Sequence, residues 1–457
     1  MSTHGLMESV SGIRGRVGDA LTPEVVARYA LAFGVWSLGQ SKSRVVVVGR
    51  DTRVSGPIFH RVATAALEAA GAHVIDLGVA PTPTIQLAVE HFHAAGGLAI
   101  TASHNPIEWN ALKLISSSGM FLDPAQGAQL RALVRQGVRG ATWENLGFSE
   151  PDPGAIQRHI ESILALAMID VEGIRRRGFR VALDTCHGAG SVIMPALLER
   201  LGCDVHVIND TPDGRFHRPP EPIAENLTEL EQLTRERNAA IGLATDPDVD
   251  RLALVSEEGR AIGEDYTLAL AAQVVLSRTP GLVVTNLSTS RIVDDVARAF
   301  GSKVERAPVG EVNVAVRMRD TGAIIGGEGN GGVILPELHL GRDAPLAAAL
   351  ALQLLADEGR SVSAIVARYP QYAIVKDKLD RPEAPLDTVY DALRVAFPGA
   401  GVDMQDGLRL EWPDRWVHIR PSGTEPIVRV IAEAPTRAAA EELVKQCRQP
   451  LDALVAA

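Results

Sequence analysis

Short apolar runs alternate with helical patterns along the first 370 residues, and this alternation occurs three times. In the first copy, residues 44–48 predict a buried strand, residues 56–70 predict a helix that Gly71 ends, and residues 73–77 predict a second strand. Each copy is a βαβ unit, so the repeat predicts three similar α/β domains. The later copies are at 180–183, 191–201 and 204–208, and at 281–285, 291–300 and 303–306.

Each copy continues, after one more helix, into another apolar strand that ends in a polar loop. These strands are predicted at 98–100, 240–244 and 323–325. Equivalent strands place their loops at the same carboxyl-terminal sheet edge, where open α/β sheets bind ligands. We therefore expect one cleft to be lined by three loops: Thr-Ala-Ser-His-Asn-Pro at 101–106, Thr-Asp-Pro-Asp-Val-Asp-Arg at 245–251, and Gly-Gly-Glu-Gly-Asn-Gly-Gly at 326–332.

The pattern changes after about residue 370. A proline-containing segment at 382–385 predicts a connector, and strands at 416–419 and 427–432 flank the loop Arg-Pro-Ser-Gly-Thr-Glu-Pro, before a helix from about 436. The expected fold is three similar α/β domains, with mixed sheets sandwiched by helices, and a smaller C-terminal α+β domain around a central cleft. We expect these domains at 1–152, 153–256, 257–370 and 371–457.

Composition narrows the classes of function. The 457 residues hold 45 Lys+Arg against 56 Asp+Glu, a net charge of -11 that disfavours nucleic acid as a partner. No apolar run approaches the roughly 20 residues of a membrane span, and the apolar stretch at 344–356 predicts a buried helix. Cys186, Cys203 and Cys447 form no Cys-x-x-Cys pair. We expect a soluble cytoplasmic protein, monomeric or homodimeric, without a membrane or nucleic-acid partner.

Ser103 stands at the end of a predicted strand, beside His104 and ten residues before Lys113. A serine can act as a nucleophile or phosphoryl carrier where other groups stabilise the charge on the transferred phosphate. A polar turn held by local hydrogen bonds is the alternative, because a serine and a histidine adjacent in sequence do not by themselves form a catalytic pair.

Asp246, Asp248 and Asp250 directly follow the second loop-bearing strand. Their mutual repulsion is costly without a cation, and oxygen ligands favour Mg²⁺ or Ca²⁺ over zinc. An EF-hand is excluded, because its sixth position would be Arg251 instead of glycine and residues 252–255 continue as a strand. The loop predicts a Mg²⁺ site, and a solvated acidic turn is the alternative.

The third and fourth loops carry groups suited to a phosphorylated sugar. Glu328 and Asn330 can hydrogen-bond sugar hydroxyls among glycines that allow close approach, although a tight hairpin would show the same pattern. The fourth loop offers donors and little bulk for a phosphate that stays on the substrate, and a capped turn is its alternative. Its candidates are Arg420, Ser422, Gly423 and Thr424, with Arg429 as a second cation. Arg14 between two glycines is, by itself, an ordinary turn.

Together and in this order, the loops resemble the α-D-phosphohexomutase superfamily, whose members move a phosphate between positions 1 and 6 of a hexose. The resemblance covers essentially the whole chain. It implies that Ser103 carries a phosphoryl group and that an oxygen of this phosphoserine joins Asp246, Asp248 and Asp250 around Mg²⁺. It further implies Arg14, Lys113 and Arg251, beside His104, as catalytic residues around the phosphate, Glu328 as the sugar-binding residue, and Arg420, Ser422 and Thr424 as the distal phosphate site.

One loop departs from the common pattern of this superfamily. Many members carry Gly-Glu-x-Ser-Gly-His, whereas Asn330 and Gly332 stand here at the serine and histidine positions. What replaces the histidine is left open. With the segments 216–222 and 341–343, this variant is similar to the archaeal-type phosphoglucosamine mutases.

The resemblance implies an enzyme that interconverts hexosamine 6-phosphate and hexosamine 1-phosphate through a phosphoserine and a hexose 1,6-bisphosphate, which also acts as activator. Glucosamine phosphate is the favoured substrate, and mannose and glucose phosphates are the alternatives. A Mg²⁺-dependent sugar-phosphate phosphatase with an aspartate nucleophile is a rival that leaves Ser103 unused. A non-catalytic regulator that binds sugar phosphates is the other.

Overall fold

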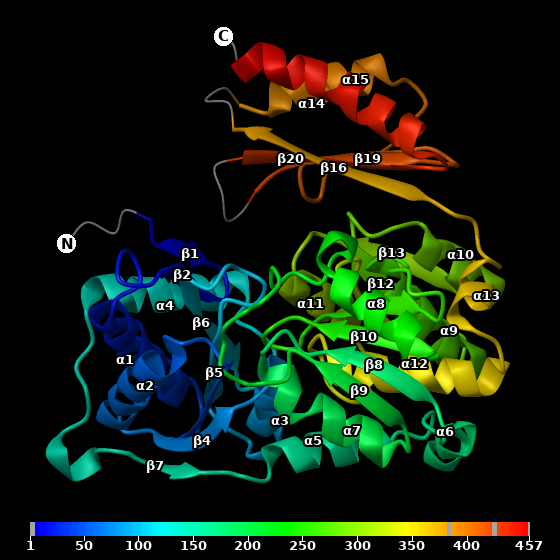
Figure 1. The fold of residues 1–457 in the computed structure, drawn as a ribbon. Coiled ribbons are helices and arrows are strands. Elements are labelled where there is room, and N and C mark those ends of the chain that lie inside the picture. The colour runs from blue at the N-terminus through cyan, green and yellow to red at the C-terminus, as the bar shows by residue number, and fades with distance from the viewer. Residues whose placement is uncertain (1–4, 382–384, 423–426, 456–457) are drawn as a thin grey trace.

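The computed structural model describes residues 5–381, 385–422 and 427–455 (Figure 1). Its strands form four sheets, one of seven strands, two of four and one of five. No helix in these described ranges is long and apolar enough to cross a membrane.

Three of the four sheets contain the same strand arrangement. The first sheet contains the order β6 (Trp109–Ser116), β5 (Gly96–Ile100), β3 (Val45–Arg50), β4 (His73–Val79). The order β11 (Leu252–Ser256), β10 (Ile241–Thr245), β8 (Arg180–Asp184), β9 (Asp204–Ile208) and the order β15 (Gly332–Ile334), β14 (Ile325–Glu328), β12 (Leu282–Asn286), β13 (Lys303–Ala307) are equivalent to it position by position. In each sheet the loop-bearing strand, β5, β10 or β14, pairs parallel with one neighbour and antiparallel with the other. The expected α/β fold and its threefold repeat are therefore confirmed.

The first unit extends this arrangement with three more strands at the edges of its sheet. β1 and β2 lie beyond β6, and β7 lies beyond β4. Its strands are β1 (Met7–Ser9), β2 (Gly12–Arg16), β3 (Val45–Arg50), β4 (His73–Val79), β5 (Gly96–Ile100), β6 (Trp109–Ser116) and β7 (Phe148–Pro151), and its helices are α1 (Pro23–Gln40), α2 (Gly56–Ala69), α3 (Thr82–His91) and α4 (Pro124–Gln136).

The second and third units follow the basic four-strand plan. The second contains β8 (Arg180–Asp184), β9 (Asp204–Ile208), β10 (Ile241–Thr245) and β11 (Leu252–Ser256) with α5 (Ala155–Leu164), α6 (Val171–Arg177), α7 (Met194–Arg200) and α8 (Thr228–Glu236). The third contains β12 (Leu282–Asn286), β13 (Lys303–Ala307), β14 (Ile325–Glu328) and β15 (Gly332–Ile334) with α9 (Asp265–Arg278), α10 (Ile292–Ala299), α11 (Glu311–Thr321), α12 (Ala344–Glu358) and α13 (Val362–Val366).

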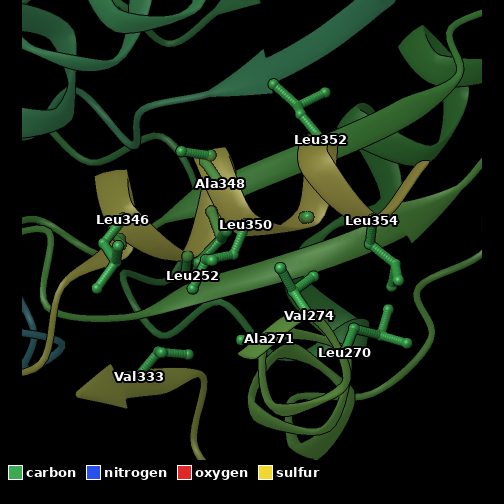
Figure 2. Close-up of a cluster of buried hydrophobic side chains, with 14 of the residues drawn as sticks. Leu252, Leu270, Ala271, Val274, Val333, Leu346, Ala348, Leu350, Leu352 and Leu354 are labelled. Carbon is green, nitrogen blue, oxygen red and sulfur yellow. The ribbon is translucent and has the colours of Figure 1, made fainter. Parts of the chain in front are cut away.

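A single hydrophobic core joins the second and third units. Helix α12 packs against α9 of the third unit and against α5, α6 and α7 of the second unit. Leu346, Leu350 and Leu352 of α12 are fully buried in the same cluster as Leu252 of β11 and Val274 of α9, and Figure 2 shows Leu350 beside Leu252. The apolar stretch at 344–356 is thus a buried helix, as its composition predicted. Because the two units share this core, their loops are held at fixed positions relative to each other.

The C-terminal part is one antiparallel sheet with two helices on the face away from the other units (Figure 1). The connector predicted at 382–385 lies almost wholly outside the described residues, because 382–384 are not among them. The strand before it, β16, pairs with β20 of this sheet. The elements are β16 (Ala373–Asp380), α14 (Asp387–Ala396), β17 (Gly401–Asp403), β18 (Leu408–Glu411), β19 (Trp416–Pro421), β20 (Ile427–Ala434) and α15 (Arg437–Val455).

Candidate active site

A cavity of about 810 Å³ lies between the sheets, and all four predicted loops contribute to its lining. The strand equivalence accounts for the first three loops, because they follow the equivalent strands β5, β10 and β14. The fourth follows β19 of the antiparallel C-terminal sheet. The predicted site residues that line the cavity are Arg14, Ser103, His104, Lys113, Arg251, Glu328, Asn330, Arg420, Ser422 and Arg429. Gly423 and Thr424 lie outside the described residues.

Ser103 is held in an unusual backbone conformation directly beside the aspartate loop. Its φ is 50°, in the left-handed region that non-glycine residues rarely adopt. The Oγ donates a hydrogen bond of 2.7 Å to Asp246 Oδ2, although 143 residues separate the two in the sequence. Ser103 and the aspartate loop therefore belong to one site.

Arg53 fixes the serine loop from behind. Its side chain is fully buried, and its Nη2 donates to the carbonyl oxygens of Ser103 and Asn105, each at 2.6 Å. The Nη1 donates to the carbonyls of Pro106 and Trp109 at 2.7 and 2.9 Å. These four hydrogen bonds fix the backbone of the loop. They therefore hold Ser103 in its left-handed backbone conformation despite the cost in energy. Sequence reasoning missed Arg53, because nothing local links it to a loop fifty residues away.

The three aspartates form a compact and fully buried acidic cluster. Their carboxylate oxygens approach within 4.8 Å of one another. Burial, and then the nearby charges of Asp250 and Asp248, raise the pKa of Asp246 well above its ordinary value. Among the described residues, Asp248 Oδ1 and Asp250 Oδ1 have no hydrogen-bond partner. Repulsion and unsatisfied oxygens of this kind fit a divalent cation with oxygen ligands.

Lys113 supplies a positive charge at the edge of the cluster. Its Nζ donates to Asp248 Oδ2 at 2.6 Å and lies 3.3 Å from Asp250 Oδ2. Burial alone would lower the pKa of Lys113, but these two carboxylates outweigh burial and raise it. Thr82 Oγ1 also donates to Asp248 Oδ2, at 2.7 Å. Lys113 is therefore an ammonium group within reach of the cavity.

More cationic groups surround Ser103 on the cavity side. Arg14 Nη1 donates to Asn105 Oδ1 at 3.0 Å, and Arg251 Nε lies 3.7 Å from Asp250 Oδ1. The positive charge of Arg251, followed by burial, lowers the pKa of His104 well below its ordinary value, which favours the neutral form of its imidazole. Its Nδ1 lies 3.4 Å from Ser103 Oγ. Such a concentration of guanidinium groups suits a phosphate dianion.

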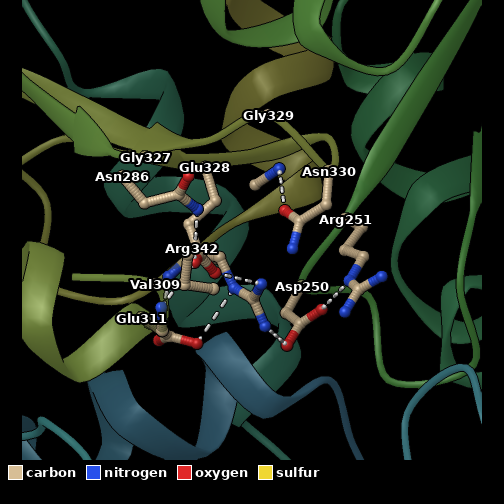
Figure 3. A network of polar contacts seen from close by, with 12 residues as sticks. Asp250, Arg251, Asn286, Val309, Glu311, Gly327, Glu328, Gly329, Asn330 and Arg342 are labelled. Atoms are coloured by element: carbon tan, nitrogen blue, oxygen red, sulfur yellow. Dashed lines mark hydrogen bonds and ion pairs between the residues drawn. The ribbon is translucent and has the colours of Figure 1, made fainter. Parts of the chain in front are cut away.

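The loop predicted at 326–332 lines the cavity with Glu328, Gly329 and Asn330, but it is shorter than predicted. Residues 326 and 327 belong to β14, which pairs antiparallel with β15, so the turn is the tight hairpin at 329–331. Glu328 Oε1 accepts from Asn286 Nδ2 at 2.8 Å and from the Gly310 amide at 2.9 Å. Its Oε2 accepts from Arg342 Nη1 at 2.7 Å (Figure 3). Glu328 is thereby held rigidly at the cavity wall.

The fourth loop places two arginines on neighbouring strands. Arg420 of β19 lies opposite Arg429 of β20 in the strand register, and both line the cavity. Arg420 Nε donates to Asp406 Oδ2 at 2.7 Å, and the Ser422 amide donates to the Ile427 carbonyl at 2.8 Å. Two like charges side by side at a cavity are a typical arrangement for binding a phosphate.

Comparison with known proteins gives the same family over the whole chain. The family models described as "Phosphoglucomutase/phosphomannomutase, alpha/beta/alpha domain I", domain II, domain III and "C-terminal domain" match residues 7–139, 157–259, 263–372 and 375–449. They occur in the order in which the structure arranges its four sheets.

Individual relatives agree with these matches. The chain is 38% identical over 439 residues, 95% of each chain, to the "Probable phosphoglucosamine mutase" of Methanopyrus kandleri. It is 39% identical over 446 residues to the "Phosphoglucomutase/phosphomannomutase" of Thermococcus kodakarensis, covering 96% of this chain and 97% of that one. A crystal structure of a phosphoglucomutase/phosphomannomutase family protein from Burkholderia thailandensis superimposes with a TM-score of 0.85 at 27% identity, over 99% of this chain and 98% of that one. The chain therefore belongs to the phosphoglucomutase/phosphomannomutase family of the α-D-phosphohexomutase superfamily.

Proposed function

We propose that this enzyme interconverts hexosamine 6-phosphate and hexosamine 1-phosphate, with glucosamine phosphate as its preferred substrate. The observation that carries the proposal is the 2.7 Å contact of Ser103 Oγ with Asp246, at a cavity that the candidate sugar and phosphate loops also line. Curated relatives named as phosphoglucosamine mutases support the choice of sugar. The family's other named activities, on glucose and mannose phosphates, are the alternative.

The proposed reaction has two opposite half-reactions at one serine. The phosphorus–oxygen bond at Ser103 breaks as a new bond forms to the free hydroxyl of the sugar monophosphate, whose proton leaves while Ser103 Oγ takes up a proton. The resulting 1,6-bisphosphate turns end for end in the cavity and returns its other phosphate to Ser103. No co-reactant is consumed, and the serine is phosphorylated again at the end of each cycle.

Each charged group has a part in this transfer. We propose that Lys113 moves the hydroxyl proton and that Arg14 and Arg251 balance the charge of the transferring phosphate, with neutral His104 beside the serine oxygen. Asp246, Asp248 and Asp250, with an oxygen of the phosphoserine, would hold Mg²⁺, which supplies further positive charge to that phosphate when bound. Glu328 and Asn330 would bind the sugar hydroxyls.

The distal phosphate site must accept both ends of the sugar in turn. We propose that Arg420, Ser422, Gly423 and Thr424 bind the phosphate that is not being transferred, with Arg429 as a second cation. Arg420 and Arg429 lie on the cavity wall contributed by the C-terminal sheet, and Ser103 lies on the wall contributed by the first unit. A phosphosugar that bridges them would therefore span from the first unit to the C-terminal sheet.

Ser103→Ala tests the proposal against both rival functions, with Ser149→Ala on the exposed strand β7 as the matched control. With Mg²⁺ and a hexose 1,6-bisphosphate present, we expect Ser103→Ala to lose mutase activity and the control to keep it. Release of inorganic phosphate by Ser103→Ala would indicate a phosphatase, and binding without turnover by the unaltered enzyme would indicate a regulator. Values of kcat/KM on glucosamine, glucose and mannose 1-phosphates decide the substrate.

A cytoplasmic location is part of the proposal. Cys186, Cys203 and Cys447 are all free thiols, as expected in a reducing compartment.

A further inference from the structure

Gly332, at the start of β15, has no room for a side chain. A Cβ built on this residue would lie 2.2 Å from Arg342 Cδ and 2.9 Å from Arg342 Cγ. The backbone φ of Gly332 is not in the left-handed region, so its conformation does not require glycine. The side chain of Arg342 therefore fills the space that any larger residue at 332 would need.

Arg342 uses this space to contact three carboxylates from three different elements (Figure 3). Its Nη2 donates to Asp250 Oδ2 at 2.6 Å, its Nη1 to Glu328 Oε2 at 2.7 Å and its Nε to Glu311 Oε2 at 3.0 Å. The side chain is 8% exposed. One planar guanidinium thus joins the proposed metal-binding loop to the proposed sugar-binding residue at a fixed separation.

The residue after Arg342 anchors the backbone at this point, in addition to the bond of 3.3 Å that the Arg342 amide donates to Glu311 Oε1. The next residue, Asp343, is the N-cap of α12, and its Oδ1 accepts from the Leu346 amide at 2.8 Å. Asp343 Oδ2 also lies 2.8 Å from His159 Nε2 and 3.0 Å from His339 Nε2, all fully buried. The arginine therefore projects from a fixed point of the shared core.

Lysine could not reproduce this arrangement. An ammonium group presents its donors at one point, whereas the guanidinium reaches the three carboxylates along divergent directions. Without the Arg342 guanidinium, Glu328 and Glu311 would lose a paired charge inside the protein, and Asp250 would keep Lys113 and Arg251 as its neighbouring cations.

We propose that Arg342 is a positioning residue that sets Asp250 relative to Glu328, and that glycine at position 332 is the substitution that makes room for it. Arg342 Cδ and Cγ fill the side-chain space at position 332, where the common pattern of the superfamily has histidine. The proposal rests on the proposed function, because it links the metal and sugar sites of that reaction. Arg342 acts through the two carboxylates and is assigned no contact with the substrate.

A double-mutant cycle tests the shared space without relying on turnover. Gly332→Ala, Arg342→Ala and the double variant are compared by thermal unfolding in metal-free buffer. We expect each single change to lower Tm and the double variant to be no less stable than Arg342→Ala, because the added methyl group then has room. Additive losses would overturn the claim that the two residues compete for one space.

Arg342→Lys tests the positioning role, with Arg317→Lys on the neighbouring helix α11 as the matched control. Arg317 is half-buried and pairs with Glu305 at 3.7 Å. We expect Arg342→Lys to raise both the KM for the sugar phosphate and the Mg²⁺ concentration for half-maximal activity by about tenfold or more. The control should change neither constant. A fall in kcat alone, or no change, would contradict positioning.

The two tests separate this inference from the proposed function. If the unaltered enzyme shows no mutase activity, the proposed function fails, while the unfolding cycle still reports on Gly332 and Arg342. If the enzyme is a mutase and the cycle is additive, the inference fails alone. Calorimetric titration of metal-free Arg342→Lys with glucosamine 6-phosphate adds a readout of sugar binding that needs no catalysis.

Discussion

At the scale of single residues, the site depends on side chains whose bonding partners are distant in the sequence. Ser103 keeps a left-handed φ of 50° because Arg53 binds the carbonyls around it. The aspartates tolerate close approach because Lys113 and Arg342 reach them from other units. The geometry of the site therefore depends on these supporting side chains as well as on Ser103 and the aspartates.

Arg53→Lys should impair turnover more than substrate binding. A lysine cannot donate to four carbonyls at once, so the serine loop loses its fixed geometry. We expect kcat to fall on the order of 10²-fold, with KM little changed, because misplacing a reacting atom costs about this much. Steady-state kinetics measure both constants. Arg50→Lys on β3, whose Nη1 makes one backbone bond at 2.9 Å, is the matched control, and equal losses in both variants would refute the special role of Arg53.

Asp246→Asn should make the metal-free protein more stable while abolishing its response to Mg²⁺. The change removes one of three buried like charges, and in the absence of metal that charge is a cost. Thermal unfolding with and without Mg²⁺ should give a higher metal-free Tm than the unaltered protein and little further rise on adding the ion. A lower metal-free Tm, or an undiminished Mg²⁺ effect, would contradict the assignment.

At the scale of elements, the local hydrophobic pattern predicted the positions of many strands, but it did not predict the hydrogen bonds between loops. The strand at 204–208 is found unchanged, because apolar alternation and a preceding glycine mark it clearly. The strand predicted at 323–325 lies instead at Ile325–Glu328, a shift that the pattern missed because the glycines in it are typical of a loop. Gly327 is needed within the strand itself, because a Cβ there would lie 2.0 Å from the Gly332 carbonyl oxygen across the hairpin.

Which residues brace the site could not be predicted from sequence. Arg53 and Arg342 stand in ordinary positions beside strand and helix ends, and only the tertiary fold brings their guanidinium groups to carbonyls and carboxylates tens of residues away. Ser103 and the aspartates were identifiable because their residue types directly follow apolar strands. The reactive residues at strand ends can thus be predicted from the local sequence, whereas the residues that hold them in place cannot.

Helix α12 should be the element whose packing matters most to the joined second and third units. Leu350 is fully buried in their common core (Figure 2), so Leu350→Ala should lower the free energy of unfolding by about 2–5 kcal/mol. Chemical denaturation followed by circular dichroism measures this loss. Val395→Ala, on the exposed face of α14 where the side chain is 80% exposed, should be nearly neutral. Similar effects of the two changes would argue against a shared core.

At the scale of the whole molecule, hydrogen bonds link the loops of the units across the cavity. Arg420 donates to Asp406, which also accepts from the Val309 amide at 3.0 Å. The adjacent Gly310 amide binds Glu328, which Arg342 ties to Asp250. The phosphate loop is thus connected to the acidic cluster through the sugar loop. The domain boundaries at 152, 256 and 370 stay predictions.

Asp406→Asn should weaken substrate binding, although Asp406 is not among the residues that line the cavity. Asparagine loses the charge that holds Arg420 and the Val309 amide together, a loss of about 1.5 kcal/mol or roughly tenfold in KM. Kinetics with glucosamine 1-phosphate measure the change. Asp403→Asn nearby is the matched control, because the Asp403 carboxylate accepts hydrogen bonds from Gln405 in its own turn. An unchanged KM in Asp406→Asn would show that the connection is not used.

The central claim is that Ser103 carries the phosphoryl group between the two ends of the sugar. Peptide mass spectrometry of the enzyme after brief incubation with a hexose 1,6-bisphosphate and Mg²⁺ tests it most directly. The account predicts about 80 Da of added phosphate on the peptide that contains Ser103, lost again when the enzyme is given excess sugar monophosphate. Phosphate on the 245–251 peptide, or full turnover by an enzyme that never carries phosphate, would contradict it.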